Sequence, residues 1–249
     1  MSGAPRTLAI DVGGTGLKAS VLDENGKMIV DRVRIDTPYP CPPGIMVDSL
    51  VDLVAPLPAH DRASVGFPGV VRDGRVITAP RFQGRHWRGY PLADALSGRL
   101  GKPVRLLNDA EVQGLGIIKG KGLEAVLTLG TGVGSAVFTD GAMSPHLELA
   151  HHPLHKEKMY NEYLGEAARR KIGRKKWNKR VLHMIDVVSE LLNYDVLFLG
   201  GGNAAHVNAD LPKNVLVASN DAGITGGIRL WDDHVWNAVP GRSAHSGFA

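Results

Sequence analysis

The sequence predicts an α/β fold in which one arrangement of strands and helices is used twice. Short runs rich in Val, Ile and Leu recur along the 249 residues and often end in glycine, which is typical of strands buried in an α/β sheet. Segments with apolar residues every three or four positions separate many of these runs and indicate amphipathic helices. The order strand, strand, strand, helix, strand at the start is followed after Gly122 by strand, strand, helix, strand, helix.

In the first half of the chain, strands are predicted where aliphatic and β-branched residues cluster. They are expected over residues 7–13, 18–23, 27–35, 63–69 and 103–109. Helices are expected over residues 44–57, 91–100 and 110–120. The proline-dense stretch 37–44 predicts a loop that leads into the first of these helices.

In the second half, the same patterns predict strands over residues 125–132, 135–141, 195–202 and 214–219. A long helical pattern runs from about Tyr160 to Asn193. The glycines at 200–202 end a strand and are expected to open a helix. A boundary between two lobes is expected near the polar pair Asn108 and Asp109, which follows a buried strand.

Composition places the chain among ordinary globular proteins, with 43% apolar residues and a net charge of +4. The single cysteine, Cys41, excludes an internal disulfide and a cysteine-rich zinc site and fits a reducing compartment. The longest run of low polarity is broken by glycines and is shorter than the ~20 residues of a membrane span. The first residues do not resemble a secretory signal. We therefore expect a cytoplasmic protein without a transmembrane helix or a membrane partner.

The segment from Arg169 to Arg180 carries eight Lys or Arg and no acidic residue. Such a run attracts polyanions, although a solvated helix face is the more common fate of a basic run. Its one tryptophan offers little surface for stacking bases, and no nucleic-acid-binding module is visible. Charge alone therefore does not choose between polyanions for this segment.

Three glycine clusters stand at the ends of predicted strands. Main-chain N–H groups at such turns bind phosphate well, whereas a simple hairpin turn is the alternative for the first cluster. The third cluster would also allow the backbone to approach a flat base closely. No P-loop and no dinucleotide-binding pattern is present. The residues concerned are Gly13, Gly14 and Thr15, then Gly130, Thr131 and Gly132, and then Gly200, Gly201 and Gly202.

An ordered set of motifs covers the chain from about Leu8 to Arg229. It reads "DVGGTGLK", "VGFPGVV", "LLNDAEVQGLG", "LGTGVGSAVFTDG", "LELAHH", "LFLGGG" and "NDAGITGG". This set resembles the ROK family of sugar kinases, and length and spacing are most similar to the bacterial polyphosphate glucokinases. The resemblance implies two actin-like (ribonuclease H-like) lobes with a central cleft, sugar between the lobes, nucleotide in the second lobe, and a homodimer.

With this resemblance, residues 1–107 are expected to form a small N-terminal lobe that a C-terminal helix at about 222–235 completes. Residues 108–221 are expected to form the large lobe. Two departures from the family pattern stand out. The three cysteines of zinc-containing members are absent, so no structural zinc is expected, and Ala150 replaces the usual glycine of the "ELGH" motif.

Phosphoryl transfer to a hydroxyl needs a group that accepts the proton of that hydroxyl. Asp109 is the candidate base, and its alternative role is to cap the helix that follows. Asn108 offers both a donor and an acceptor to a sugar with several hydroxyls.

Asp11 ends the first predicted strand beside the glycine turn and is the candidate ligand of Mg²⁺, through water. Its alternative is to bond the amides of its own turn. Lys18 would contact phosphate as a point charge, or else face solvent.

Glu148 and His151 lie three residues apart, and the resemblance makes them contacts of the sugar hydroxyls. A further acidic contact is assigned to Glu162, at a point where the motif slips by a residue. Pro68 and Gly69 close one wall of the sugar site or merely turn the chain. Four histidines, at 146, 151, 152 and 155, also suggest a metal, although histidines cluster by chance.

The function that we expect is transfer of a phosphoryl group from polyphosphate, ATP or both to the 6-hydroxyl of glucose, with Mg²⁺. With this resemblance, the basic stretch from Arg169 to Arg180 is expected to follow a linear polyphosphate, and no nucleic-acid partner is expected. One alternative is a strictly ATP-dependent hexokinase for another sugar. A second is a sensor of sugar or polyanion that has lost turnover, and a third is a basic protein that binds nucleic acid.

Overall fold

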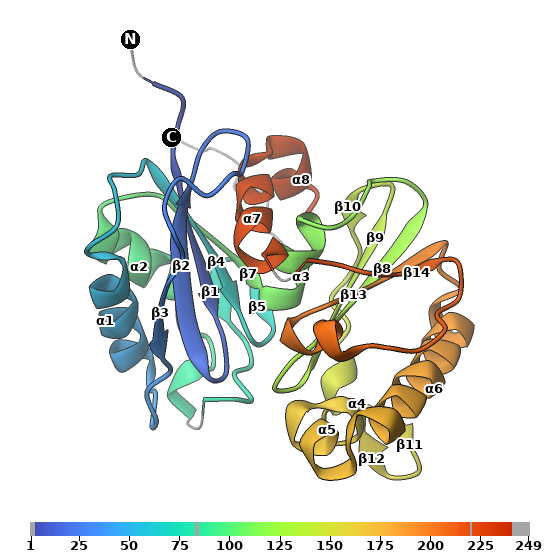
Figure 1. Ribbon diagram of the computed structural model, residues 1–249. Coiled ribbons are helices and arrows are strands. Elements are labelled where there is room, and N and C mark those ends of the chain that lie inside the picture. The colour runs from blue at the N-terminus through green and yellow to red at the C-terminus, as the bar shows by residue number, and fades with distance from the viewer. Residues whose placement is uncertain (1–2, 83–84, 220, 241–249) are drawn as a thin grey trace.

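The computed structural model describes residues 3–82, 85–219 and 221–240, and it contains two five-stranded sheets (Figure 1). The first sheet has the order β3 (Val33–Asp36), β2 (Gly16–Leu22), β1 (Thr7–Val12), β4 (Arg62–Phe67), β7 (Val104–Asn108). The second has the order β10 (Ala142–Met143), β9 (Val133–Thr139), β8 (Leu123–Leu129), β13 (Val196–Gly200), β14 (Val215–Val217).

The two sheets share one topology. In each, the first three strands in chain order pair antiparallel and the last two add in parallel to the opposite side of the first. A parallel strand needs a crossover connection, which the intervening helices supply. The predicted α/β class and the repeated unit are therefore confirmed.

Helices cover the outer faces of both sheets and also fill the space between them (Figure 1). The first sheet packs its outer face on α1 (Pro43–Val54) and α2 (Leu92–Leu100), and the second on α6 (Arg174–Leu192). Between the sheets lie α3 (Asp109–Leu115), α7 (Ala222–Thr225), the 3₁₀ helix η4 (Gly226–Trp231) and α8 (Asp233–Asn237). In β1, the alternation of strand side chains sends Leu8, Ile10 and Val12 into the outer core and leaves the small Ala9 on the inner face.

The end of the chain returns to the first sheet. Ser64 Oγ donates to the carbonyl of Gly227 (2.6 Å) and accepts from Nε1 of Trp231 (2.9 Å). Arg105 donates to the carbonyl of Leu230 (2.6 Å). These contacts support a proposal that residues 1–107 and about 222–235 form one lobe, and residues 108–221 the other.

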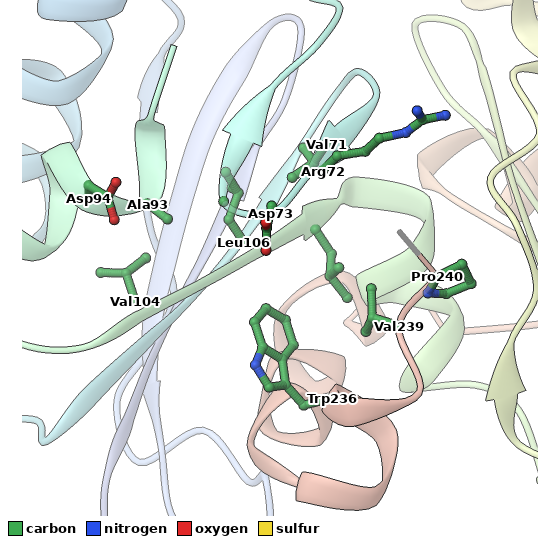
Figure 2. A pocket seen from close by; sticks show the side chains of 12 residues that line it. Val71, Arg72, Asp73, Ala93, Asp94, Val104, Leu106, Trp236, Val239 and Pro240 are labelled. Atoms are coloured by element: carbon green, nitrogen blue, oxygen red, sulfur yellow. The ribbon is translucent and has the colours of Figure 1, made fainter. Parts of the chain in front are cut away.

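A small cavity of about 160 Å³ marks the place where the segment after α8 meets the first sheet. Figure 2 shows Trp236, Val239 and Pro240 on one side of it and Leu106 with Val71 on the other. The side chains are mainly apolar, and they hold the C-terminal segment against β7 and the short hairpin of β5 (Val71–Arg72) and β6 (Arg75–Val76).

Several predicted elements differ in the structure. The C-terminal helix expected at about 222–235 is two short α-helices, α7 and α8, with the 3₁₀ helix η4 between them. The long helical pattern after Tyr160 is three helices, α4 (Tyr160–Leu164), α5 (Glu166–Ile172) and α6, because glycines at 165 and 173 end the first two. Of the strand expected over 27–35, the last residues pair in the sheet as part of β3, and Met28 forms an isolated bridge with Leu22 of β2. The helix α3 ends at Leu115, since its C-cap is Gly116.

Several short elements had no counterpart in the predictions, because a pair of residues carries no visible periodicity. They are β10 and the hairpin of β11 (Pro153–His155) with β12 (Lys158–Met159), besides β5, β6 and the 3₁₀ turns η1 (Arg85–Trp87) and η2 (Leu149–His151). The 3₁₀ helix η3 (Gly202–His206) stands where a helix was expected after the glycines at 200–202. Among the helices of the described residues, none combines the length and the apolar character that crossing a membrane requires.

Candidate active site

One cleft of about 910 Å³ lies between the two sheets and takes its walls from both halves of the chain. Nearly all predicted site residues line it: Asp11, Gly13, Gly14, Thr15, Lys18, Pro68, Gly69, Asn108, Asp109, Gly130, Thr131, Gly132, Glu148, His151, Gly201 and Gly202. Within the described part of the chain, Glu162 and Gly200 stand outside this lining. Residues that are up to about 190 positions apart in sequence thus share one site.

The turn between β1 and β2 presents unused N–H groups to the cleft. Gly13 donates its own N–H to the carbonyl three residues on (3.0 Å). Thr37 Oγ1 donates to the carbonyl of Gly13 (2.8 Å), and the Tyr39 hydroxyl donates to the carbonyl of Gly14 (2.6 Å). Both carbonyls are therefore engaged in hydrogen bonds within the protein. No acceptor among the described residues takes the N–H of Gly14 or Thr15. Both donors are therefore available to an anion.

The turn between β8 and β9 has the same construction. Gly130 donates its N–H to the carbonyl of Gly132 (2.8 Å), and its own carbonyl accepts from the N–H of Glu166 (3.0 Å) and from Asn203 Nδ2 (2.9 Å). The N–H groups of Thr131 and Gly132 have no acceptor within residues 3–82, 85–219 and 221–240. The two turns therefore offer two separate sets of main-chain donors to one cleft.

The third glycine cluster serves the protein backbone itself. Gly201 has φ of +80°, and a side chain there would overlap the backbone of Leu129 at the end of β8. A Cβ on Gly200 would lie 3.0 Å from Oε1 of Gln113, so this glycine faces a neighbouring helix. Gly201 thus allows a close approach of β13 to β8, while Gly202 also lines the cleft and has no atom within 4 Å of the place where a Cβ would stand. The expected approach of this cluster to a flat base stays a prediction. The cluster opens the 3₁₀ helix η3 in place of an α-helix.

Asp109 is the first residue of α3, and the cap of that helix is its neighbour. The side chain of Asn108 accepts from the N–H groups of Ala110 (2.8 Å) and Glu111 (3.4 Å). Its Nδ2 donates to the carbonyls of Phe67 (3.4 Å) and Gly69 (3.1 Å). These four bonds use the hydrogen-bonding capacity of the Asn108 amide. They connect the "GFPG" loop, residues 66–69, to the start of α3. Because Asn108 is the N-cap, Asp109 does not have to cap the helix.

The Asp109 carboxyl is held in a state that suits a general base. Burial raises its pKa, and the negative charges of Asp11, Glu148 and Glu111 raise it further. The hydrogen bond from the Ala110 N–H (2.9 Å) acts in the opposite direction, and the resulting pKa is about 7. A carboxyl with such a pKa accepts a proton near neutral pH far better than an ordinary Asp does.

His146 joins two carboxylates at the wall of the site. Its Nδ1 lies 2.8 Å from Oε1 of Glu111, and its Nε2 lies 3.4 Å from Oε2 of Glu148. Burial alone would lower the pKa of His146, but the hydrogen bonds and charges of the two glutamates outweigh it and raise the pKa to about 9. His146 is therefore an imidazolium at neutral pH and fixes Glu148, the predicted sugar contact.

Asp11 and Lys18 face each other on paired strands. Lys18 Nζ lies 3.0 Å from Oδ2 of Asp11, and both side chains are partly buried. The described residues contain no group of three or more His, Cys, Asp or Glu side chains placed to share a metal ion. Asp11 is thus a single carboxylate at the edge of the first turn, which is the kind of ligand that Mg²⁺ takes together with water.

Residues 7–151 match the family model described as ROK family. The chain is 31% identical to the polyphosphate glucokinase of Mycobacterium tuberculosis in an alignment that covers 87% of this chain and 88% of that protein. The chain belongs to the ROK family.

Solved structures agree with this assignment. The inorganic polyphosphate/ATP-glucomannokinase from Arthrobacter sp. strain KM superimposes with a TM-score of 0.82 at 30% identity, over 91% of this chain and 97% of that one. A ROK family glucokinase from Streptomyces griseus, solved in complex with glucose and AMPPNP, has a TM-score of 0.76 at 19% identity, over 90% of this chain and 98% of that one, and shows the common fold. The fold is the actin-like one that the motifs implied, and this ROK protein is a sugar kinase, a phosphotransferase with an alcohol acceptor.

The alanine in the ROK motif "ELAH" is accommodated without strain. Among described residues other than glycine, positive φ occurs at Asp73, Asp140, Lys156 and Asn193, so Ala150 has an ordinary backbone. It lines the cleft between Glu148 and His151 with its side chain nearly buried. The freedom of a glycine is not needed at this position.

Glu162 has a local task away from the cleft. It lies in the first turn of α4, and its carboxylate accepts from the N–H of Met159 (3.1 Å). The polar residue that this segment does contribute to the cleft is Asn161, whose Oδ1 accepts from the N–H of Val133 (2.7 Å). The slip of one residue in the motif was the signal that the assignment to Glu162 was insecure.

Proposed function

We propose that this ROK kinase transfers a terminal phosphoryl group from inorganic polyphosphate, and also from ATP, to the 6-hydroxyl of glucose. The observation that carries the proposal is the shared cleft, which is lined both by Asp109 and by two glycine turns with unused N–H groups. The names of the relatives in Mycobacterium and Arthrobacter, at 31% and 30% identity, support glucose as the acceptor and polyphosphate as a donor.

In the proposed reaction, Asp109 accepts the proton of the sugar hydroxyl while the oxygen attacks the terminal phosphorus. Its pKa of about 7 makes it ionised for a large part of the time at neutral pH and still basic enough for the transfer. Glu148 and His151 orient the sugar through its hydroxyls, and His146 holds Glu148 in place. The N–H groups of the two turns bind the donor phosphates.

The donor set in the cleft fits a magnesium ion. Asp11 would hold Mg²⁺ through water, and its second oxygen is not engaged by Lys18. When bound, the ion would neutralise charge on the donor phosphates. Lys18 supplies a positive charge at the same edge of the cleft.

The basic segment supports polyphosphate as a donor. Arg170 lines the cleft, and four neighbouring lysines are exposed and without an ion pair among the described residues: Lys171, Lys175, Lys176 and Lys179. All four arginines of the segment have partners, since Arg169 and Arg170 pair with Glu166, Arg174 donates to the carbonyl of His206, and Arg180 donates to the carbonyl of Tyr163. The lysines are thus free to follow a chain of phosphates that leaves the cleft past Arg170.

A coupled assay that offers each donor separately tests the function. We expect turnover of glucose with polyphosphate and with ATP. Changing the four lysines together to Gln is expected to raise KM for long-chain polyphosphate by about tenfold, because fewer phosphate charges are neutralised, and to leave KM for ATP within about twofold. The matched control changes four exposed lysines elsewhere, Lys102, Lys119, Lys121 and Lys213, and is expected to leave both KM values unchanged.

No turnover with polyphosphate in the wild type would leave the alternative of a strictly ATP-dependent hexokinase. Equal effects of the two lysine sets would remove the proposed path along α5 and α6. The same assay run over several hexoses identifies the preferred acceptor. We also propose a homodimer, which light scattering would report as twice the chain mass of 26.6 kDa.

A further inference from the structure

Arg81 extends from the loop between β6 and η1 into the cleft and lies between the two glycine turns. A Cβ built on Gly14, in the first turn, would lie 3.5 Å from Cδ of Arg81 and 3.7 Å from its Nε. A Cβ built on Gly132, in the second turn, would overlap its Nη2. The stem of this side chain therefore runs along one turn and the guanidinium reaches the other.

The charge of Arg81 is not neutralised by the protein. No carboxylate of the described residues forms an ion pair with it. The other cations of the cleft each have an acidic partner, since Lys18 pairs with Asp11, Arg34 with Asp36 (2.8 Å) and Arg170 with Glu166. An unpaired guanidinium between two sets of free N–H groups makes a concentrated site for a multiply charged anion.

We propose that Arg81 is a catalytic residue that binds the phosphoryl group during its transfer. This inference rests on the proposed function and adds to it the group that contacts the moving phosphorus centre. Its place between the turns is where the proposed function puts the transferred phosphoryl group, because the N–H groups of both turns are assigned to the donor phosphates.

In this step the sugar oxygen forms a bond to the terminal phosphorus and gives its proton to Asp109. The bond from phosphorus to the bridging oxygen breaks, and its electron pair leaves with the donor, which becomes ADP or a polyphosphate shorter by one unit. Arg81 donates hydrogen bonds to the non-bridging oxygens, on which negative charge is spread in the transition state. A planar guanidinium can contact two of these oxygens together, which an ammonium cannot do with the same geometry.

The test uses R81A and R81K with ATP and with polyphosphate as separate donors. In R81A, kcat is expected to fall by about 100-fold to 1,000-fold with each donor that the wild type uses, while KM for glucose changes by less than about threefold. Addition of guanidinium ion is expected to restore part of the kcat of R81A, a response that a merely structural role would not give. R81K is expected to recover less than about a tenth of the wild-type kcat, because its point charge lacks the planar fork.

The matched control is R85A, which removes an exposed arginine four residues further along the same segment and is expected to keep wild-type kinetics. Glucose binding by R81A, measured by calorimetry, reports whether the variant is folded. A kcat of R81A within threefold of the wild type, a loss confined to KM for glucose, or a loss that guanidinium leaves unchanged would overturn the proposal. A wild type that uses ATP alone would contradict the polyphosphate part of the proposed function, and the ATP arm would still decide the role of Arg81.

Discussion

Replacing Asp109 with Asn is expected to lower kcat by about 100-fold to 10,000-fold while leaving the Kd for glucose within about threefold. The amide has nearly the same shape as the carboxyl, but it cannot accept the proton of the sugar hydroxyl. Kinetics of phosphoryl transfer and calorimetry of glucose binding, run on the same preparation, measure the two effects. D210N, which changes an exposed aspartate, is the matched control.

The same variant is expected to be more stable than the wild type at pH 8. The pKa of Asp109 is raised in the folded state, from an unfolded value of ~4 to about 7, so the protonated form stabilises the fold. That stabilisation is complete below about pH 4 and is lost as the pH rises through 7. D109N removes the buried charge, which is expected to raise the free energy of unfolding at pH 8 by roughly 1–4 kcal/mol.

The activity of the wild type follows the opposite trend, because the base works only when it is ionised. We expect kcat/KM to rise with pH and to level off above about pH 7. An unchanged kcat in D109N would contradict the role of Asp109 as the base, and equal stability of the two proteins at pH 8 would contradict its raised pKa.

Replacing His146 with Gln is expected to destabilise the protein by about 3 kcal/mol at pH 7, because two glutamates would face each other without the cation between them. Without His146, each glutamate would lose its ion pair. Glu111 is buried, so water would replace little of that interaction, whereas Glu148 is partly buried and water would replace more of it. Because Glu148 loses its support, KM for glucose is expected to rise by about tenfold. Chemical denaturation and steady-state kinetics measure these changes.

The destabilisation caused by H146Q is expected to depend on pH in one direction. The folded state raises the pKa of His146 from an ordinary ~6.5 to about 9, so its stabilisation is complete below about pH 6.5 and is lost as the pH rises through 9. The stability difference between the wild type and H146Q is therefore expected to shrink above pH 9. H86Q, at an exposed histidine, is the control. A difference that stays constant from pH 6 to pH 10 would show that His146 is neutral.

The repeated fold could be predicted because its signals are local. Buried strands and amphipathic helices carry their own periodicity, and the glycine turns mark strand ends. The breaks at Gly165 and Gly173 were harder to place, because the helical pattern continues across both glycines in sequence, whereas the structure gives each of them a non-helical backbone that ends α4 and α5.

Most site residues that belong to a sequence motif line the cleft as predicted. Residues that only the tertiary structure brings to the site were missed. Asn108 and Asp109 are adjacent polar residues, and only the structure shows that the first is the N-cap of α3 and that the second is not. Arg81 and His146 stand in no glycine turn, and their tasks depend on Gly132 and Glu111, which are distant in sequence. The position of His146 two residues before Glu148 was the one available signal for it.

The central claim is that both glycine turns and Asp109 act on one pair of substrates in one cleft. A crystal structure with glucose and a non-hydrolysable ATP analogue tests it most directly. We expect the terminal phosphate within hydrogen-bond distance of the N–H groups of both turns, and the 6-hydroxyl of glucose about 3 Å from the Asp109 carboxylate. A complex in which either ligand lies outside this cleft, or in which Asp109 contacts neither, would contradict the account.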